Sequence, residues 1–123
     1  MHLPQKGRKD VGERLYKVGV ENCCISKITK AELLYGAYKE SNFEREMEII
    51  NKFISLFQVL PISEAISTYA QQKARLRKAG TQIEDLDLFI GSTAIAYNLV
   101  MVTENVKHFE VQKGIEIENW VKR

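Results

Sequence analysis

The sequence predicts an α/β domain built on a mainly parallel sheet. Short apolar runs alternate with longer amphipathic segments along the 123 residues. The connections between these runs are long enough to hold crossover helices, which is how parallel strands are joined. The apolar run Leu99–Thr103 is typical of a strand that is buried on both faces of such a sheet.

Length and composition fit a single domain covering residues 1–123. Hydrophobic residues make up 45% and charged residues 28%, which is ordinary for a globular protein. A net charge of +2 is too small to indicate a nucleic-acid partner by itself.

The cysteines and the N-terminal residues suggest a reducing compartment. Cys23 and Cys24 are neighbours on a predicted strand, so their side chains should point to opposite faces and not pair. The first residues contain no apolar segment of signal-peptide length, and no apolar run is long enough to span a membrane. We therefore expect a cytoplasmic location and no membrane partner.

The first part of the chain should contain a tail, a strand and two helices. Residues 1–10 are polar and are expected to form a loose tail. Leu15 and Val18, three residues apart, predict a short helix over Gly12–Val18. A strand is expected at Cys23–Ile28, and Thr29–Glu32 matches a capping box that opens a helix over Lys30–Lys39.

The middle of the chain continues the alternation. Asn42 is a suitable N-cap for a helix over Phe43–Leu56, whose apolar residues follow a 3.6-residue period. Phe57–Leu60 predicts a short strand. Ser63 should cap the next helix, and Gly80 should end it.

The last part adds a helix and two strands. Thr81–Glu84 is a second capping-box match and should open a helix that runs to Tyr97. Asn98 should end that helix in the left-handed conformation, before the strand Leu99–Thr103. Ile115–Glu118 alternates apolar and acidic residues, as an edge strand does.

Acidic and polar residues follow the predicted strands or open the predicted helices. They are Glu32, Asp85, Asp87, Thr103 and Asn105. Function collects beyond the carboxyl ends of parallel strands, so these groups are expected to converge there. Clustered carboxylates repel each other unless a cation is bound or their pKa values rise. Oxygen donors of this kind suit Mg²⁺ or Mn²⁺, which can activate water for phosphodiester cleavage.

Each of these residues also has a purely structural interpretation. Glu32 and Glu84 occupy the fourth position of a capping box and can hold a backbone N–H. Asp85 and Asp87 in a first helical turn complement the helix dipole. Asn105 is a common turn residue. Spacing alone leaves both interpretations open.

Four segments in order resemble the PIN-domain ribonuclease family, specifically the VapC-like toxins of VapBC-type (type II) toxin–antitoxin systems. The segments are residues 25–36 (ISKITKAELLYG), 80–90 (GTQIEDLDLFI), 99–109 (LVMVTENVKHF) and 114–120 (GIEIENW). The resemblance covers roughly Gly12 to Trp120. It implies a three-layer α/β/α fold with a mainly parallel central sheet.

The resemblance also implies roles for individual residues. Glu32 matches the second metal-binding acid of the family and Asp87 the third, while Asn105 matches its fourth position. Thr103 matches the hydroxyl beside that position, and Asp85 is a further, lower-ranked candidate ligand. The implied activity is Mg²⁺-dependent endonucleolytic cleavage of RNA by a metal-activated water, with Mn²⁺ as an alternative ion.

One family feature has no match. Family members begin with an apolar strand that ends in Asp-Thr-Asn, and that Asp is the first metal ligand. Nothing before Cys23 resembles this strand, and Asp10 has no apolar strand ahead of it. We therefore expect weak or absent nuclease activity from the chain as given.

A basic run and two tyrosines are candidate contact residues. Lys73, Arg75, Arg77 and Lys78 are expected either to contact RNA phosphates or to form a solvated helix face. Tyr35 and Tyr38 suit a dimer face, a groove for an antitoxin helix, or the core.

Three functions are consistent with the sequence. The first is the nuclease toxin, whose partners by resemblance are RNA, a cognate antitoxin and a second copy of the chain. The second is a PIN-like binding module that dimerises or binds an antitoxin without cutting. The third is an unrelated α/β scaffold without a site.

Overall fold

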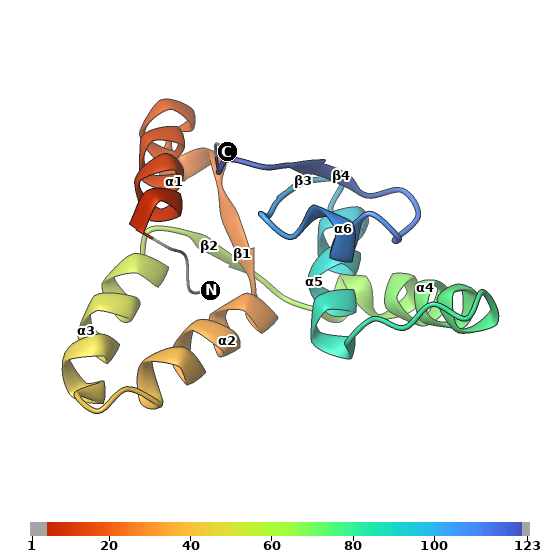
Figure 1. The fold of residues 1–123 in the computed structure, drawn as a ribbon, viewed down its shortest axis with the longest axis horizontal. Helices are drawn as coiled ribbons and strands as arrows, with labels where there is room; N and C mark the ends of the chain where they lie inside the picture. The colour runs from red at the N-terminus through yellow and green to blue at the C-terminus, as the bar shows by residue number, and fades with distance from the viewer. Residues whose placement is uncertain (1–4, 122–123) are drawn as a thin grey trace. The chain divides into compact units, whose positions relative to one another are not determined.

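The computed structural model describes residues 5–121, with side chains from Asp10 onward. The chain forms two compact units, one ending at Pro61 and the other beginning at Ile62. The first contains α1 (Gln5–Val18), a 3₁₀ turn (Val20–Asn22), β1 (Cys24–Ser26), α2 (Lys27–Tyr38), α3 (Phe43–Ile54) and β2 (Gln58–Leu60). The second contains a 3₁₀ turn (Ser63–Ala65), α4 (Ile66–Lys78), α5 (Asp85–Ala96), β3 (Val100–Val102), α6 (Val106–Phe109) and β4 (Glu116–Glu118) (Figure 1).

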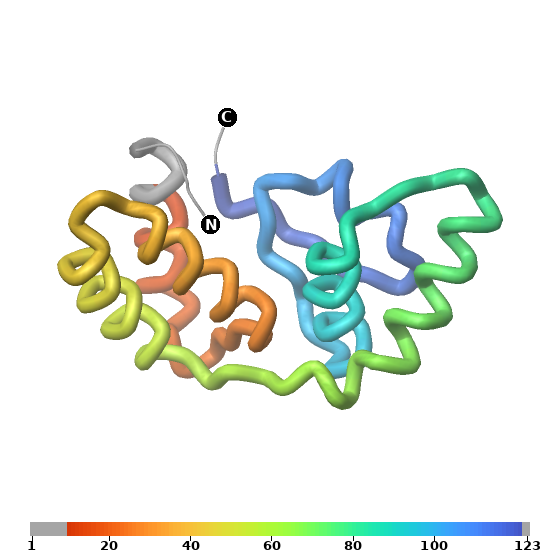
Figure 2. Tube along the Cα trace, turned by 90° about the horizontal axis from the view of Figure 1, so that it is seen from below, coloured from red at the N-terminus to blue at the C-terminus, as the bar shows by residue number. Residues whose placement is uncertain are grey.

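In the first unit, α2 and α3 connect two parallel strands. β1 pairs with β2 from Cys24–Gln58 to Ser26–Leu60. The two helices pack against each other and lie side by side in Figure 2. Ala37, Ile54 and Leu60 form buried apolar positions of this unit.

In the second unit, α4 packs on α5, and β3 pairs with β4 in parallel. Its apolar core includes Leu76, Leu88, Phe109 and Trp120. Both strand pairs are parallel, so the predicted α/β class is confirmed. None of the helices within residues 5–121 has the length and hydropathy needed to cross a membrane.

The helix α2 begins earlier than the capping-box motif predicts. Ser26 is the N-cap, and its Oγ accepts a hydrogen bond from the Thr29 backbone N at 3.0 Å. The helix therefore starts at Lys27, and the predicted capping box Thr29–Glu32 is wrong. Glu32 lies in the second turn of α2, beyond the third helical position that a capping-box glutamate occupies.

The second capping-box prediction, Thr81–Glu84, is also wrong. Gly80 has φ +74°, and the Thr81 N–H donates to Leu76 O at 2.9 Å. This bond closes a Schellman motif, so Thr81 belongs to the end of α4. The prediction that Gly80 ends this helix is confirmed. The helix α5 begins at Asp85, after an N-cap Glu84 whose side chain makes no capping bond.

Two other predicted helix ends are confirmed, but the predicted Ser63 cap is wrong, because Ser63 lies in a 3₁₀ turn and α4 begins at Ile66 after the N-cap Ala65. The Asn42 side chain accepts from Arg45 N at 3.4 Å at the start of α3. Asn98 has φ +57° just after α5. Residues 5–10 belong to α1 rather than to the predicted loose tail, and residues 1–4 lie outside the described range.

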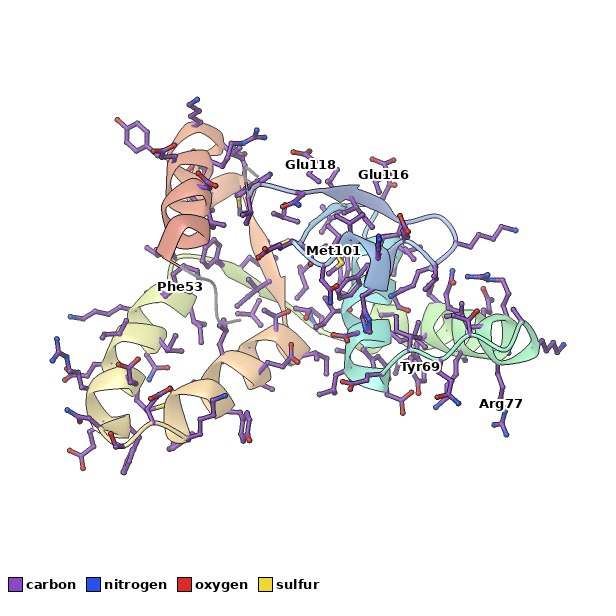
Figure 3. The ribbon with its side chains drawn as sticks, viewed as in Figure 1. Phe53, Tyr69, Arg77, Met101, Glu116 and Glu118 are labelled. Atoms are coloured by element: carbon purple, nitrogen blue, oxygen red, sulfur yellow. The ribbon has the colours of Figure 1, made fainter. Side chains whose placement is uncertain are left out.

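The strand β3 is less buried than its sequence predicts. Val100 is 43% exposed and Val102 is 38% exposed, so burial on both faces is wrong. Val100 and Val102 point to the same face of β3, and the less exposed Met101 points to the other. The alternation of β4 is confirmed, because Glu116 and Glu118 are exposed and Ile117 between them is half-buried. Glu116 and Glu118 project outward in Figure 3, and Met101 of β3 lies on the side toward α5.

The two cysteines are free, as predicted. Burial raises the pKa of the Cys23 thiol, and the nearby Glu21 carboxylate raises it further. Burial likewise raises the pKa of the Cys24 thiol, with a smaller contribution from Cys23. A thiol with a raised pKa carries less of the reactive thiolate.

Candidate functional site

Asp87 lies in the first turn of α5, where two residues from the segment after β3 reach it. Its Oδ2 atom is 2.8 Å from Nε2 of His108, and the side chain is 24% exposed. Its backbone carbonyl accepts a hydrogen bond from Nε2 of Gln112 at 3.4 Å. The carboxylate is therefore held on one side and still accessible to solvent.

Asp85, two residues earlier, is engaged with α4. Its Oδ1 accepts hydrogen bonds from Nζ of Lys73 at 2.9 Å and from the Tyr69 hydroxyl at 2.9 Å. Tyr69, labelled in Figure 3, stacks on Phe89 with ring centroids 3.9 Å apart. Asp85 thus ties α4 to α5, which makes it a weaker candidate ligand than Asp87.

The Lys73 ammonium and the Tyr69 hydroxyl hold the pKa of Asp85 below its ordinary value. The Asp85 and Tyr69 hydrogen bonds raise the pKa of Lys73 in turn. A lowered carboxyl pKa gives stability that is present above the unfolded-state pKa and lost as the pH falls through the folded-state pKa. The raised lysine pKa gives stability that is lost only as the pH rises through its own folded-state value.

We therefore expect Asp85→Asn to lower the unfolding midpoint of the second unit between about pH 5 and pH 9. The difference from the wild type should shrink as the pH falls toward 3, because Asp85 then becomes protonated in both folded and unfolded states. The effect should be small because both side chains are about half exposed. Thermal unfolding followed by the fluorescence of the single Trp120 measures it. A difference that stays constant down to low pH would contradict the assignment.

Thr103 and Asn105 shape the turn after β3. The buried Thr103 hydroxyl accepts a hydrogen bond from the Asn105 backbone N at 3.0 Å. Asn105 is exposed and is the N-cap residue of α6, although its side chain makes no capping bond. Thr103 therefore fixes the backbone that carries Asn105, and the Asn105 amide is not used to cap the helix.

Glu32 is exposed on α2, in the first unit, whereas the other candidate residues lie in the second. Its convergence with Asp87 stays a prediction. In the part of the chain that the structure describes, no three His, Cys, Asp or Glu side chains gather as metal ligands do. Asp87 and Asn105 are nevertheless oxygen donors of the type that Mg²⁺ prefers.

The four residues of the predicted basic run differ in their contacts: two bond to other parts of the chain and two are exposed. Arg75 donates to the Val111 carbonyl at 2.7 Å and to the Gln72 side chain at 2.9 Å, and Lys73 pairs with Asp85. Arg77 and Lys78 are exposed in the last turn of α4, and Arg77 points outward in Figure 3. Of the four, Arg77 and Lys78 are the ones available to an external anion.

Two hollows flank the loop that precedes α5. A shallow hollow of about 210 Å³ is lined by Gln82, Ile83, Glu84 and His108. A larger cleft of about 510 Å³ lies on the α4 side, and Arg77 and Asp85 are among the residues that line it. His108 thus lines one hollow while it contacts Asp87.

Sequence reasoning missed His108, Gln112 and Tyr69. His108 contacts Asp87 from 21 residues away along the chain, and no local spacing detects a partner on another helix. Gln112 is 2% exposed although it is polar, which no pattern in the sequence indicates. The sequence offered one indication of a role for His108, because it lies within the segment 99–109 that resembles the family.

Sequence comparisons place the chain among known proteins. The family model for the PIN domain matches residues 2–114. A tRNA(fMet)-specific endonuclease VapC of Salmonella typhimurium is 36% identical over 106 residues, covering 85% of this chain and 80% of that protein. Ribonuclease VapC1 of Haemophilus influenzae is 30% identical over 124 aligned positions, covering 99% of this chain and 92% of that protein.

Solved structures agree with the sequence matches. DNA-bound VapBC from Salmonella typhimurium superposes with a TM-score of 0.86 at 36% identity, covering 91% of this chain and 85% of that chain. VapBC-1 from nontypeable Haemophilus influenzae gives a TM-score of 0.83 at 30% identity, covering 93% and 87%. The chain therefore belongs to the PIN-domain family, among the VapC ribonucleases of VapBC toxin–antitoxin modules.

Proposed function

We propose that this chain is the toxin of a VapBC-type module and that its RNA-cleaving chemistry depends on Mg²⁺ or Mn²⁺ bound through Glu32, Asp87 and Asn105. The observation that carries the proposal is Asp87, a partly exposed carboxylate at the start of α5 whose Oδ2 lies 2.8 Å from Nε2 of His108. Glu32 enters through its match to the family motif. Asp85 is not included among the proposed ligands, because its Oδ1 atom already accepts hydrogen bonds from Lys73 and Tyr69.

The residues would divide the work as follows. When bound, a divalent ion lowers the pKa of a water molecule and neutralises charge on the phosphate. Asp87 and Glu32 offer carboxylate oxygens, which are ligands and not covalent nucleophiles. Thr103 holds the backbone of Asn105 through its 3.0 Å hydrogen bond and so presents the Asn105 amide in a fixed turn.

Asp87 and Asp85 provide a matched pair of variants for testing the metal role. Both lie in the first turn of α5 and lose the same charge on mutation to Asn. Calorimetry with Mn²⁺ should show binding to the wild type, little change in Asp85→Asn, and a loss in Asp87→Asn greater than the roughly 10–100-fold that removal of an outer contact costs. Glu32→Gln/Asp87→Asn should abolish binding. Equal losses in the two single variants would contradict the assignment.

The 123 residues carry matches to the later acids of the family but not to its Asp-Thr-Asn strand. We therefore propose that they cut RNA weakly or not at all. A time course with Mn²⁺ on structured and unstructured RNA measures this. Rapid turnover that vanishes in Asp87→Asn would show that the proposed weakness is wrong.

RNA contact is proposed for Arg77 and Lys78, the two basic residues of the run that are exposed and lack an internal partner among the described residues. Contacts of this kind bind phosphates and weaken with salt. Lys73 and Arg75 are proposed to contribute less to RNA binding, because they already bond to Asp85 and to the Val111 carbonyl.

A second candidate function, binding without cutting, is favoured by the surface of the first unit. Tyr35 is 68% exposed and Tyr38 is 61% exposed, so the core interpretation of these tyrosines is excluded. Phe43 is 42% exposed on α3, and its ring lies 6.0 Å from that of Tyr38. Exposed aromatic side chains are typical of protein interfaces. A cognate antitoxin or a second copy of the chain is proposed to cover them, and the solved VapBC relatives are toxin–antitoxin complexes.

We expect Tyr35→Ala/Tyr38→Ala to weaken antitoxin binding or dimerisation by about 10-fold or more, since buried tyrosines are frequent interface hot spots. Leu56→Ala is the control, because Leu56 is similarly exposed at 53% but lies beyond the end of α3. Light scattering measures the dimer, and calorimetry with the antitoxin measures the complex. Unchanged values for both would exclude this surface.

A further inference from the structure

The segment that follows β3 contacts Asp87 at two separate points. His108, in α6, brings its Nε2 atom to 2.8 Å from Oδ2 of the carboxylate. Gln112, just after α6, donates from Nε2 to the Asp87 backbone carbonyl at 3.4 Å. One side chain therefore fixes the carboxylate, and the other fixes the backbone from which it extends.

Gln112 is buried and closely packed. It is 2% exposed and lies against Gly91, where any Cβ atom would collide with it. Its Nε2 atom donates to the Asp87 carbonyl, whereas its Oε1 atom is buried without a hydrogen-bond partner among the described residues, so packing and this one bond hold the side chain. The first turn of α5 is therefore tied to the segment 105–112.

The contact made by His108 is polar and local. Nε2 is buried, lies 2.8 Å from Oδ2 of Asp87, and makes no aligned hydrogen bond with any described residue.

From this geometry we infer that His108 is a positioning residue for Asp87, assisted by Gln112. His108 lies against Oδ2 and so restricts the rotamers that the carboxylate can adopt. For its functional meaning the inference rests on the proposed role of Asp87 as a metal ligand. The positioning itself is a property of the protein alone.

The first test uses the metal-free chain and the ¹³C resonance of the Asp87 carboxyl carbon, assigned by its loss in Asp87→Asn. His108→Leu removes the contact, and His108→Asn is too short to make it. His108→Gln places an N–H donor at a similar reach. The resonance should shift in the first two variants and return toward the wild-type position in the third. An unchanged resonance in both His108→Leu and His108→Asn would overturn the inference.

The second test asks whether positioning affects ligand binding. His108→Leu and His108→Asn should weaken Mn²⁺ binding by about 10–100-fold, and His108→Gln should recover most of it. Lys107→Leu, a neighbouring exposed residue, is the control and should bind as the wild type does. Binding lost with Asp87→Asn but unaffected by every His108 variant would overturn the inference. If the wild type binds no Mn²⁺, the proposed metal role fails, while the resonance test still decides whether His108 positions Asp87.

Discussion

Leu88→Ala should lower the free energy of unfolding of the second unit by about 2–5 kcal/mol, the range for removing a buried leucine side chain. Leu88 is 1% exposed and lies on the buried face of α5. Truncation removes its apolar contacts and leaves a cavity that packed neighbours fill only in part. Urea unfolding followed by Trp120 fluorescence measures the change, because Trp120 lies in the same unit.

Leu86→Ala is the matched control for this prediction. Leu86 lies two residues earlier on α5 and is 48% exposed. The chemical change and the helix are the same, so the difference between the two variants isolates the effect of burial. We expect the exposed site to cost less than about 1 kcal/mol. Similar losses at both sites would mean that α5 does not bury the face described.

Gly91→Ala should destabilise the second unit by about 1–3 kcal/mol, the usual cost of overpacking a core. A Cβ atom at Gly91 would lie 2.6 Å from Cδ of Gln112. Gln112 is fully buried and cannot move without losing its bond to the Asp87 carbonyl. Alanine also favours the helix by about 1 kcal/mol, which offsets part of the loss.

Gly36→Ala provides the control of opposite sign. Gly36 lies in the interior of α2, and no atom lies within 4 Å of a Cβ built there. The substitution should stabilise the first unit by about 0.5–1 kcal/mol. The double variant Gly91→Ala/Gln112→Ala should lose less than the sum of its two single variants, because the smaller side chain makes room. Strict additivity would argue against contact between the two residues.

The sequence alone determined the alternation of strands and helices, since it follows from local patterns. Asn42 begins α3 and Asn98 ends α5 as predicted, because side-chain capping and the left-handed conformation depend on the residue itself. The family also followed from the sequence, because four ordered segments preserve its residue pattern.

The tertiary structure decided which of two competing local signals applies. Ser26 caps α2 in place of Thr29, and Thr81 is used to close α4 and so cannot open α5. A backbone N–H at a helix end bonds to the acceptor that the local fold brings to it. The Thr29 N–H bonds to Ser26, and the Thr81 N–H bonds to Leu76, so neither predicted capping box forms.

The same holds for the acids at the start of α5. Asp85 and Asp87 both lie in a predicted first helical turn, yet Lys73 and Tyr69 of α4 engage the first, while His108 contacts the second. These partners lie 12 to 21 residues away along the chain and are brought together by the packing of α4 and α6 on α5. A local pattern describes a helix face but not what packs against it, so only the fold could show that α4 engages Asp85 and that α6 contacts Asp87.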